Sequence, residues 1–179
     1  MTSLGDGASR AGRAEREEAG VNRLLCEVFG PESERRHDAS GRPWLYVSGK
    51  RQDVNISISH SRRHAVLAVA PSGVDIGVDV EEWREQLTRV APRVLSPEEL
   101  SEYGSSADGL LRGWTLKEAL YKASRHLLHR EPEFASQLVL PLGGRDACVL
   151  EGGDAREFSS QTVVEDGVCI ALVWRTTGT

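Results

Sequence analysis

Two short stretches of this sequence gather side chains that could do chemistry. In the first, Val74-Asp75-Ile76-Gly77-Val78-Asp79-Val80-Glu81, apolar and polar residues alternate strictly. This is the period of a β-strand, which sends successive side chains to opposite faces. One face can be buried, and the other carries Asp75, Asp79 and Glu81. Acidic residues are depleted in strands and repel one another when stacked, so the pattern indicates either a solvated acidic face or a site for a hard cation or a phosphate.

The second stretch, Trp114-Thr115-Leu116-Lys117-Glu118-Ala119-Leu120-Tyr121-Lys122-Ala123, predicts a helix. Helical spacing places Trp114, Glu118 and Lys122 on one face, at i, i+4 and i+8. Taken alone, Glu118 and Lys122 also fit an ordinary surface ion pair, worth about 0.2–0.5 kcal/mol. Trp114 is expected to pack in the core.

Two weaker segments precede these stretches. Gly41-Arg42-Pro43-Trp44 fits an ordinary turn followed by a core tryptophan, or an arginine presented beside a ligand. Ser59-His60 ends an alternating strand, and His60 could bind phosphate or satisfy backbone groups of the turn. Beyond the acidic strand, Glu82 is expected to be solvated.

The elements that must position these residues follow from hydrophobic periodicity and from turn signals. We expect helices at Ala14–Phe29, Trp83–Val90, Pro97–Tyr103 and Ala107–Leu128; a polar loop at 31–43; and strands at Trp44–Val47, Val54–Ser59, Ala65–Ala70, Val74–Glu81, Leu138–Leu140, Ala147–Leu150, Arg156–Val164 and Val168–Trp174. A helix followed by strands occurs both before and after the acidic strand. The order predicts an α+β fold of two related halves.

Charge and cysteine usage exclude several classes of protein. The 179 residues fit one compact domain or two small lobes, and the net charge of −5 implies no general affinity for nucleic acid. The cysteines Cys26, Cys148 and Cys169 have no CxxC spacing, which argues against a zinc site and a disulfide framework. No stretch is long and apolar enough to span a membrane, and Met1–Gly12 lacks the apolar core of a signal peptide. We expect a cytoplasmic protein with a disordered tail at residues 1–12.

Together, the motifs resemble those of the 4′-phosphopantetheinyl transferases. Ser59-His60, the strand Gly77–Glu81 and the helix Trp114–Ala123 occur in that family's order, preceded by its Gly-Lys/Arg-Pro turn at Gly41-Arg42-Pro43. The resemblance covers roughly residues 41–125 and is closest to the larger two-lobed type, which activates peptide and polyketide synthases. It implies two pseudo-symmetric α+β halves, at residues 13–74 and 75–179, with the active site at their seam.

The resemblance also implies an activity and its residues. Members transfer the 4′-phosphopantetheine arm of coenzyme A to a serine of an apo acyl or peptidyl carrier protein, using Mg²⁺ (or Mn²⁺), and release adenosine 3′,5′-bisphosphate. By position, the metal ligands are Asp79, Glu81 and Glu118, and the catalytic residues are Glu118 and Lys122; residues that bind coenzyme A are Arg42, Ser59, His60, Asp79 and Lys122. Asp75 lies outside the motif and is expected to be structural. The implied protein is a monomer that binds neither nucleic acid nor membrane.

The chain departs from the family pattern in two places. The segment before Gly41 is short, which leaves Arg35 and Arg36 as candidates to hold the 3′-phosphate of coenzyme A. After Ala123 the common Gly-x-Gly is replaced by Ser124-Arg125-His126. Two alternatives stay open: a non-catalytic protein that binds carrier or coenzyme A, and a different Mg²⁺-dependent phosphotransferase or hydrolase that is indifferent to carrier protein.

Overall fold

The computed structural model describes residues 10–39, 41–128, 137–143, 147–151 and 155–177. The N-terminal elements are α1 (Arg10–Phe29), β1 (Ser33–His37), β2 (Pro43–Val47), β3 (Lys50–Arg51), β4 (Val54–His60) and β5 (Ala65–Pro71). The C-terminal elements are β6 (Val74–Glu82), α2 (Leu87–Val90), η1 (Ala91–Arg93), α3 (Pro97–Tyr103), α4 (Ala107–Ser124), η2 (Arg125–Leu127), β7 (Leu138–Val139), β8 (Ala147–Leu150), β9 (Arg156–Glu165) and β10 (Val168–Thr176). The mixture of sheets and helices agrees with the predicted α+β class.

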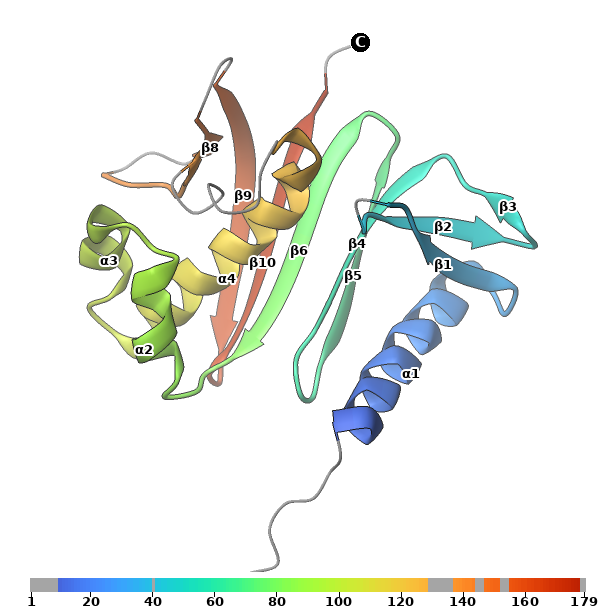
Figure 1. Cartoon of the computed structure of the whole chain (residues 1–179), viewed down its shortest axis with the longest axis horizontal. Helices are drawn as coiled ribbons and strands as arrows, with labels where there is room; N and C mark the ends of the chain where they lie inside the picture. The colour runs from blue at the N-terminus through green and yellow to red at the C-terminus, as the bar shows by residue number, and fades with distance from the viewer. Residues whose placement is uncertain (1–9, 40, 129–136, 144–146, 152–154, 178–179) are drawn as a thin grey trace, which may run out of the picture.

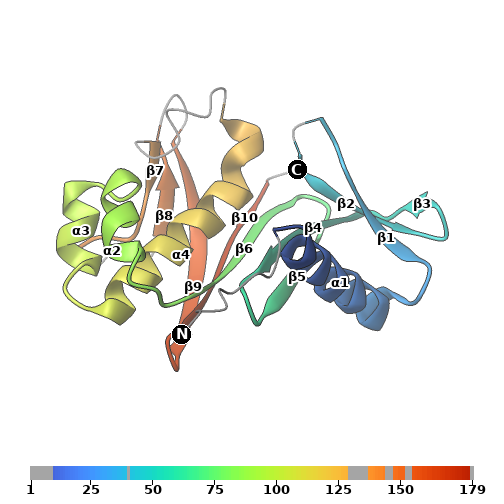
Figure 2. The same cartoon turned by 60° about the horizontal axis from the view of Figure 1, so that its bottom comes forward.

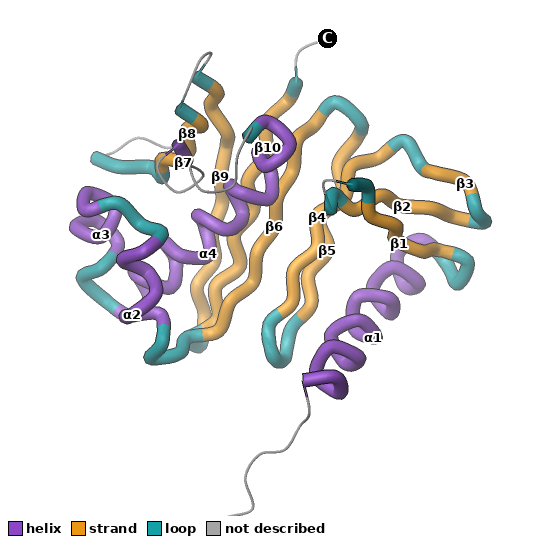
Figure 3. Tube along the Cα trace, viewed as in Figure 1, coloured by secondary structure: helices purple, strands orange, loops and turns teal. Residues whose placement is uncertain are grey.

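In the part of the chain that the structure describes, three antiparallel sheets carry the fold. The first has the order β1-β2-β3, the second pairs β4 with β5, and the third has the order β6-β10-β9-β8-β7. The view in Figure 1 places β6 between the β4–β5 pair and the rest of the third sheet, with α4 lying across β6 and β10. The tube in Figure 3 shows β4 and β5 running beside β6. The acidic strand β6 is therefore the element where the two groups of strands meet.

The buried hydrophobic side chains of the described residues form two clusters. Val21 and Leu25 of α1 pack with Leu45 and Ile56 in the N-terminal half. Figure 2 shows α1 lying along β5 and β1. The larger C-terminal core gathers buried side chains of α4 and the third sheet, among them Leu111, Leu120 and Phe158. Among the described helices, none is long and apolar enough to cross a lipid bilayer.

A row of polar side chains on β4 fastens the second sheet to β6. Asn55 Nδ2 donates to the Val74 carbonyl oxygen at 2.8 Å, and the Val78 N–H donates to Ser57 Oγ at 2.9 Å. Ser59 Oγ donates to Asp79 Oδ1 at 2.6 Å. Because these positions alternate along β4, one face of the strand is committed to β6, while Ile56 on the other face enters the N-terminal core.

Several predicted boundaries need correction. Residues 31–43 are not only a loop, because β1 pairs with β2 through Ser33–His37. The predicted helix Trp83–Val90 is helical only from Leu87, since the Trp83 N–H donates to the Gly167 carbonyl oxygen at 2.7 Å and continues the strand direction. Helix α1 begins at Arg10, whereas most of the predicted tail lies outside the described residues. Helix α4 ends at Ser124 and continues as one 3₁₀ turn.

Candidate functional site

Helix α4 covers the acidic face of β6. A Cβ at Gly77 would lie 2.0 Å from the Ala119 carbonyl oxygen, so only glycine lets the helix backbone come this close to the strand. Asp75 and Asp79, on the same face, are only 4% and 7% exposed. The interpretation of β6 as a strand with a solvated acidic face is therefore wrong.

The rotation of α4 about its axis is fixed by a buried ion pair. Lys117 is 1% exposed, and its Nζ donates to both carboxylate oxygens of Glu99 at 2.8 Å. Glu99 also closes the capping box that starts α3 and accepts the Leu140 N–H at 2.9 Å. With Lys117 held on this side, Glu118 and Lys122 are directed toward β6, where Lys122 reaches Asp79.

Asp79 and Lys122 form the centre of the candidate site. Lys122 Nζ lies 2.8 Å from Asp79 Oδ1, the oxygen that also accepts from Ser59. The same ammonium donates to the Val78 carbonyl oxygen at 3.2 Å and, more weakly, to that of Ile58 at 3.5 Å. Lys122 thus bridges both halves of the chain, and the simple interpretation of a Glu118–Lys122 surface ion pair is wrong for Lys122.

Two further carboxylates lie in the field of Asp79. Burial raises the pKa of Glu118, the Asp79 charge raises it further, and Lys122 partly offsets both effects. Burial likewise raises the pKa of Glu81, whereas Arg84, at 3.0 Å, lowers it. Asp79 and Glu82 add to the increase at Glu81. Both directions have the same main cause, the burial of a carboxylate, to which the neighbouring charge of Asp79 adds.

The chemistry of this donor set fits a divalent cation. Carboxylate oxygens are the ligands that Mg²⁺ prefers, and a cation would relieve the repulsion that raises the pKa values of Glu81 and Glu118. Yet within the described residues no three His, Cys, Asp or Glu side chains stand close enough together to hold a metal ion. Asp79 is engaged by Lys122 and Glu81 by Arg84. The donors are suitable, but their side chains do not form a ready-made cage.

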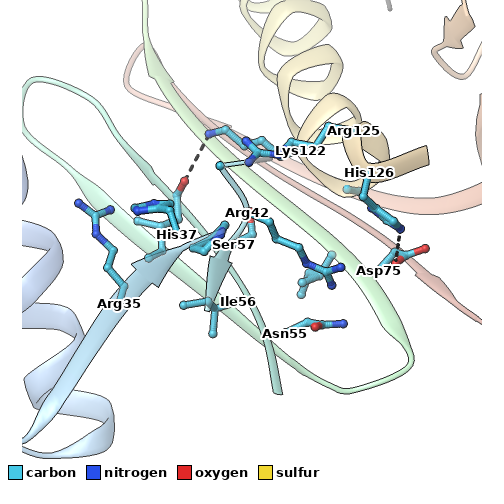
Figure 4. Close-up of a pocket in the computed structure, with 15 residues that line it drawn as sticks. Arg35, His37, Arg42, Asn55, Ile56, Ser57, Asp75, Lys122, Arg125 and His126 are labelled. Carbon is cyan, nitrogen blue, oxygen red and sulfur yellow. Dashed lines mark hydrogen bonds and ion pairs between the residues drawn. The ribbon is translucent and has the colours of Figure 1, made fainter. Parts of the chain in front are cut away.

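A basic cavity of about 150 Å³ opens beside Lys122, between the two halves. Cationic and ring side chains line it from both sides: Arg35, His37, Arg42, Lys122, Arg125 and His126. Figure 4 shows Arg35, His37 and Arg42 on the side of the N-terminal strands, and Arg125 and His126 at the end of α4. One acid, Asp75, also lines the cavity, and Arg35 is paired with Glu18. Basic side chains outnumber this acid, so the lining favours an anionic ligand.

Arg42 is held at this cavity by the turn that precedes β2. Asp38 Oδ1 accepts the Arg42 N–H at 3.0 Å, and Asp38 Oδ2 accepts from Trp44 Nε1 at 3.1 Å. The Arg42 and Arg51 guanidinium groups lie 4.7 and 3.5 Å from the centre of the Trp44 ring. Trp44 is therefore an arginine-stacking residue rather than the predicted core tryptophan, and the turn does present Arg42 to a cavity.

Ser59 and His60 lie apart from the cavity lining. Ser59 Oγ instead donates a hydrogen bond to Asp79 Oδ1 at 2.6 Å. His60 Nδ1 is 3.7 Å from Glu17 Oε2 of α1. The structure thus brings Arg42 and Lys122 together around the cavity and Ser59 with Asp79, whereas His60 occupies the α1 side of the strand end.

Two other acids have clear structural partners. Asp75 lies 2.6 Å from Arg175 and 3.1 Å from His126, which agrees with the structural role expected for it. Glu82 is not solvated as predicted: its side chain is 13% exposed and accepts from Ser61 Oγ at 2.6 Å and from the Arg63 N–H at 2.9 Å. The tight turn after β4 therefore binds Glu82.

Some cavity residues were missed by the sequence analysis. His37, Arg125 and His126 line the cavity but were not assigned to the site. The signal available for Arg125 and His126 was their position directly after the helix of Lys122, where they replace a common Gly-x-Gly. His37 gave no signal, because its segment looked like a polar loop.

Comparisons with known proteins identify a family for this chain. The description of the matching family is "ACPS: 4′-phosphopantetheinyl transferase superfamily", and the match covers residues 75–173, more than half of the chain. The holo-[acyl-carrier-protein] synthase of Mycoplasma genitalium is 35% identical over 86 residues, which cover 42% of this chain and 73% of that protein. The family match includes Asp79, Glu81, Glu118 and Lys122, and begins after Arg42, Ser59 and His60.

Proposed function

Because the chain belongs to the 4′-phosphopantetheinyl transferase superfamily, we propose that it transfers the phosphopantetheine arm of coenzyme A to a serine of an apo carrier protein. The reaction would need Mg²⁺ and would release adenosine 3′,5′-bisphosphate. The observation that carries this proposal is the position of Lys122, which contacts Asp79 at 2.8 Å and also lines a basic cavity between the two halves. An acidic cluster and a phosphate-complementary cavity thus share one side chain.

The cavity would hold the nucleotide part of coenzyme A. Arg42 and Lys122 would face its phosphates, and Arg35 is a further candidate, since it lines the same cavity. Charge-assisted contacts between guanidinium groups and phosphate are among the stronger hydrogen bonds in proteins. His60 stays a predicted ligand on the strength of its motif alone.

Asp79, Glu81 and Glu118 would hold the metal ion. When bound, Mg²⁺ supplies polarisation of the phosphorus centre and neutralises charge on the diphosphate. Either Glu118 or water on the metal would accept the proton of the carrier serine as the serine oxygen attacks the phosphorus atom. Lys122 would donate to the oxygen of the departing bisphosphate.

The N-terminal half extends the chain beyond the family match. Residues 10–71 supply α1 and five strands, with Arg35 and Arg42 on one wall of the cavity. We interpret this half as the first lobe of the larger, two-lobed type, which would complete the site within one chain. Pseudo-symmetry of the halves, a monomeric state and a cytoplasmic location stay predictions.

The test is intact mass spectrometry of apo acyl and peptidyl carrier proteins incubated with the protein, coenzyme A and Mg²⁺. We expect a gain of one phosphopantetheine per carrier, lost when EDTA is added. Asp79→Ala and Glu118→Ala are expected to abolish the gain while circular dichroism shows an intact fold. Glu102→Ala, which removes an exposed carboxylate of α3, is the matched control and should keep full activity.

Two outcomes would contradict the proposal. Retention of most activity by Asp79→Ala would remove the metal assignment. Binding of coenzyme A without a gain in mass on any carrier would favour the alternative of a protein that binds carrier or coenzyme A without turnover.

A further inference from the structure

The ammonium group of Lys122 sits where a bound cation would sit. Its oxygen partners are Asp79 Oδ1 at 2.8 Å, the Val78 carbonyl at 3.2 Å and the Ile58 carbonyl at 3.5 Å. One carboxylate and two carbonyl oxygens form the kind of surroundings that proteins build for cations. The Ile58 carbonyl belongs to β4, whereas the Val78 carbonyl and the Asp79 side chain belong to β6. The ammonium group therefore also connects β4 to β6.

The Lys122 ammonium binds the carboxylate of Asp79, which is also a proposed ligand of the metal ion. Asp79 has a side chain only 10% exposed, and its Oδ1 already accepts from Ser59 as well as from Lys122. A divalent ion at this carboxylate would stand within a few ångströms of a second positive charge in a poorly screened region. The ion and the Lys122 ammonium therefore compete for Asp79.

Lys122 has room to leave. Its side chain is 26% exposed, and it lines the basic cavity directly beside Asp79. In Figure 4, Lys122 reaches from α4 to the edge of this cavity, and a dashed line marks its bond to the β4 carbonyl. A flexible four-carbon stem allows the ammonium to turn from Asp79 into the cavity while α4 stays fixed.

We propose that Lys122 is an exchangeable internal cation. Without ligand it occupies Asp79 and closes the seam between β4 and β6. On binding of Mg²⁺ with an anionic diphosphate, the ion takes Asp79 and the ammonium moves to the diphosphate in the cavity. This inference rests on the proposed function for the identity of the ligand, but the competition at Asp79 follows from the contacts of Lys122 alone.

The exchange has a consequence for binding in the absence of coenzyme A. In the absence of a diphosphate, Mg²⁺ must displace the Lys122 ammonium from Asp79, and the ammonium then has no anion to bind. We therefore expect Mg²⁺ alone to bind weakly. A diphosphate supplies that partner, and the two ligands then favour each other's binding, as reciprocal linkage requires. If Mg²⁺ bound without displacing the ammonium from Asp79, removing the charge of Lys122 would lower stability, and any gain in Mg²⁺ binding from lost repulsion would not depend on Asp79.

The test is isothermal titration of Mg²⁺ into the protein without coenzyme A. We expect Lys122→Met to bind Mg²⁺ at least tenfold more tightly than the wild type, and Asp79→Asn in the same background to remove this gain. Lys50→Met, which loses the same charge at an exposed position of β3, is the control and should stay within twofold of the wild type. Lys122→Gln, which keeps a donor for Asp79 without the charge, provides a second variant if Lys122→Met does not fold.

The outcomes separate this inference from the proposed function. Equal or weaker Mg²⁺ binding by folded Lys122 variants overturns the exchange, even if the wild type modifies carrier proteins. A tenfold gain that depends on Asp79 supports the exchange, even if no carrier protein accepts phosphopantetheine. If Mg²⁺ binding rises but no carrier protein is modified, Asp79 is a cation site, and only the proposed transferase function is contradicted.

Discussion

Gly77 of β6 and Ala119 of α4 are in backbone-to-backbone contact. A Cβ at position 77 would lie 2.0 Å from the Ala119 carbonyl oxygen and 2.6 Å from the Ala123 nitrogen. Both obstacles are helix backbone, which cannot yield as a flexible side chain does. This contact sets the distance between the strand that carries Asp79 and the helix that carries Glu118 and Lys122.

Gly77→Ala is therefore expected to damage both the fold and the site. Overpacking of this kind costs about 1–3 kcal/mol, and here the upper end applies because backbone must move. Displacing α4 would also separate Lys122 from Asp79, so transfer should fall by more than the loss of folded protein explains. Thermal unfolding and the carrier mass assay measure the two effects.

The matched control for this change is Gly20→Ala in α1. There the added Cβ would meet only the Ala65 Cβ at 3.8 Å, an ordinary contact. Because alanine favours helices over glycine by about 1 kcal/mol, this variant should be as stable as the wild type or more so. Equal behaviour of the two variants would contradict the close-approach argument.

Glu118→Gln is expected to abolish transfer and yet stabilise the ligand-free protein. Burial and the charge of Asp79 raise the pKa of Glu118 above its ordinary value of 4.5. A carboxyl group with a higher pKa in the folded state stabilises the fold when protonated. This contribution is complete below the unfolded pKa and is lost as the pH rises through the folded pKa. At neutral pH the ionised group therefore opposes folding, and glutamine should raise stability by about 1 kcal/mol.

The pH dependence provides the check on this prediction. The difference in melting temperature between Glu118→Gln and the wild type should be small below pH 4.5 and grow as the pH rises above it. Glu102→Gln, on the exposed face of α3, should show no such dependence. A variant that is less stable than the wild type at neutral pH would show that Glu118 makes a net favourable contact as a carboxylate.

Ser59→Ala is expected to weaken metal binding rather than to unfold the protein. Its hydroxyl donates to Asp79 at 2.6 Å and so orients the carboxylate. Loss of a residue that orients a metal ligand typically costs about 10–100-fold in metal affinity. The Mg²⁺ concentration for half-maximal transfer should rise accordingly.

Ser57→Ala is the comparison for this serine. Ser57 Oγ accepts the Val78 N–H at 2.9 Å, so its loss leaves a buried backbone donor without that partner and should lower stability by about 1–3 kcal/mol. We expect its Mg²⁺ requirement to change less than that of Ser59→Ala. An equal or larger change for Ser57→Ala would contradict the orienting role of Ser59 at Asp79.

Alternating and helical hydrophobic patterns were sufficient to place most elements. Strands β4, β5 and β6 and helix α4 lie where the periodicity predicted them, with boundaries that differ by a few residues. Strand β1 was missed, because Ser33–His37 is polar throughout and offers no hydrophobic alternation. It forms because β2 supplies a hydrogen-bonding partner and because Arg36 stacks on Tyr46 at 4.3 Å.

The sequence predicted which residues belong to the candidate site better than it predicted which atoms those residues contact. The order of motifs selected Asp79 and Lys122, and the structure places them in contact. No local pattern shows that Lys122 would bind the carboxylate itself, or that Ser59 would donate to the same oxygen. The Lys122 contact depends on the backbone approach of α4 at Gly77, and the Ser59 contact depends on the packing of β4 against β6. Both contacts join segments that lie far apart in the sequence. Glu82 was predicted wrongly for the same reason, since its partners Ser61 and Arg63 lie in another turn.

Arg35 and Arg36 offer a final test, because neighbouring residues of one strand face opposite sides. Arg35 lines the basic cavity. Arg36 does not line it, and instead pairs with Glu34 and stacks on Tyr46. Arg35 also has a partner, Glu18 of α1, so a phosphate would share or replace that ion pair. If the cavity holds the phosphates of coenzyme A, Arg35→Ala removes a charge-assisted contact worth about 1.5–3 kcal/mol. The KM for coenzyme A should then rise at least tenfold, since each 1.4 kcal/mol is about a factor of ten.

Arg36→Ala removes the same charge one residue away and should leave the KM for coenzyme A within twofold of the wild type. The two variants have equal net charge, so a difference between them reports on position and not on general electrostatic attraction. Steady-state transfer to a carrier protein with varied coenzyme A measures both. Equal increases in KM would mean that coenzyme A senses only the overall charge of β1, and that its phosphates bind outside the cavity that Arg35 and Arg42 line.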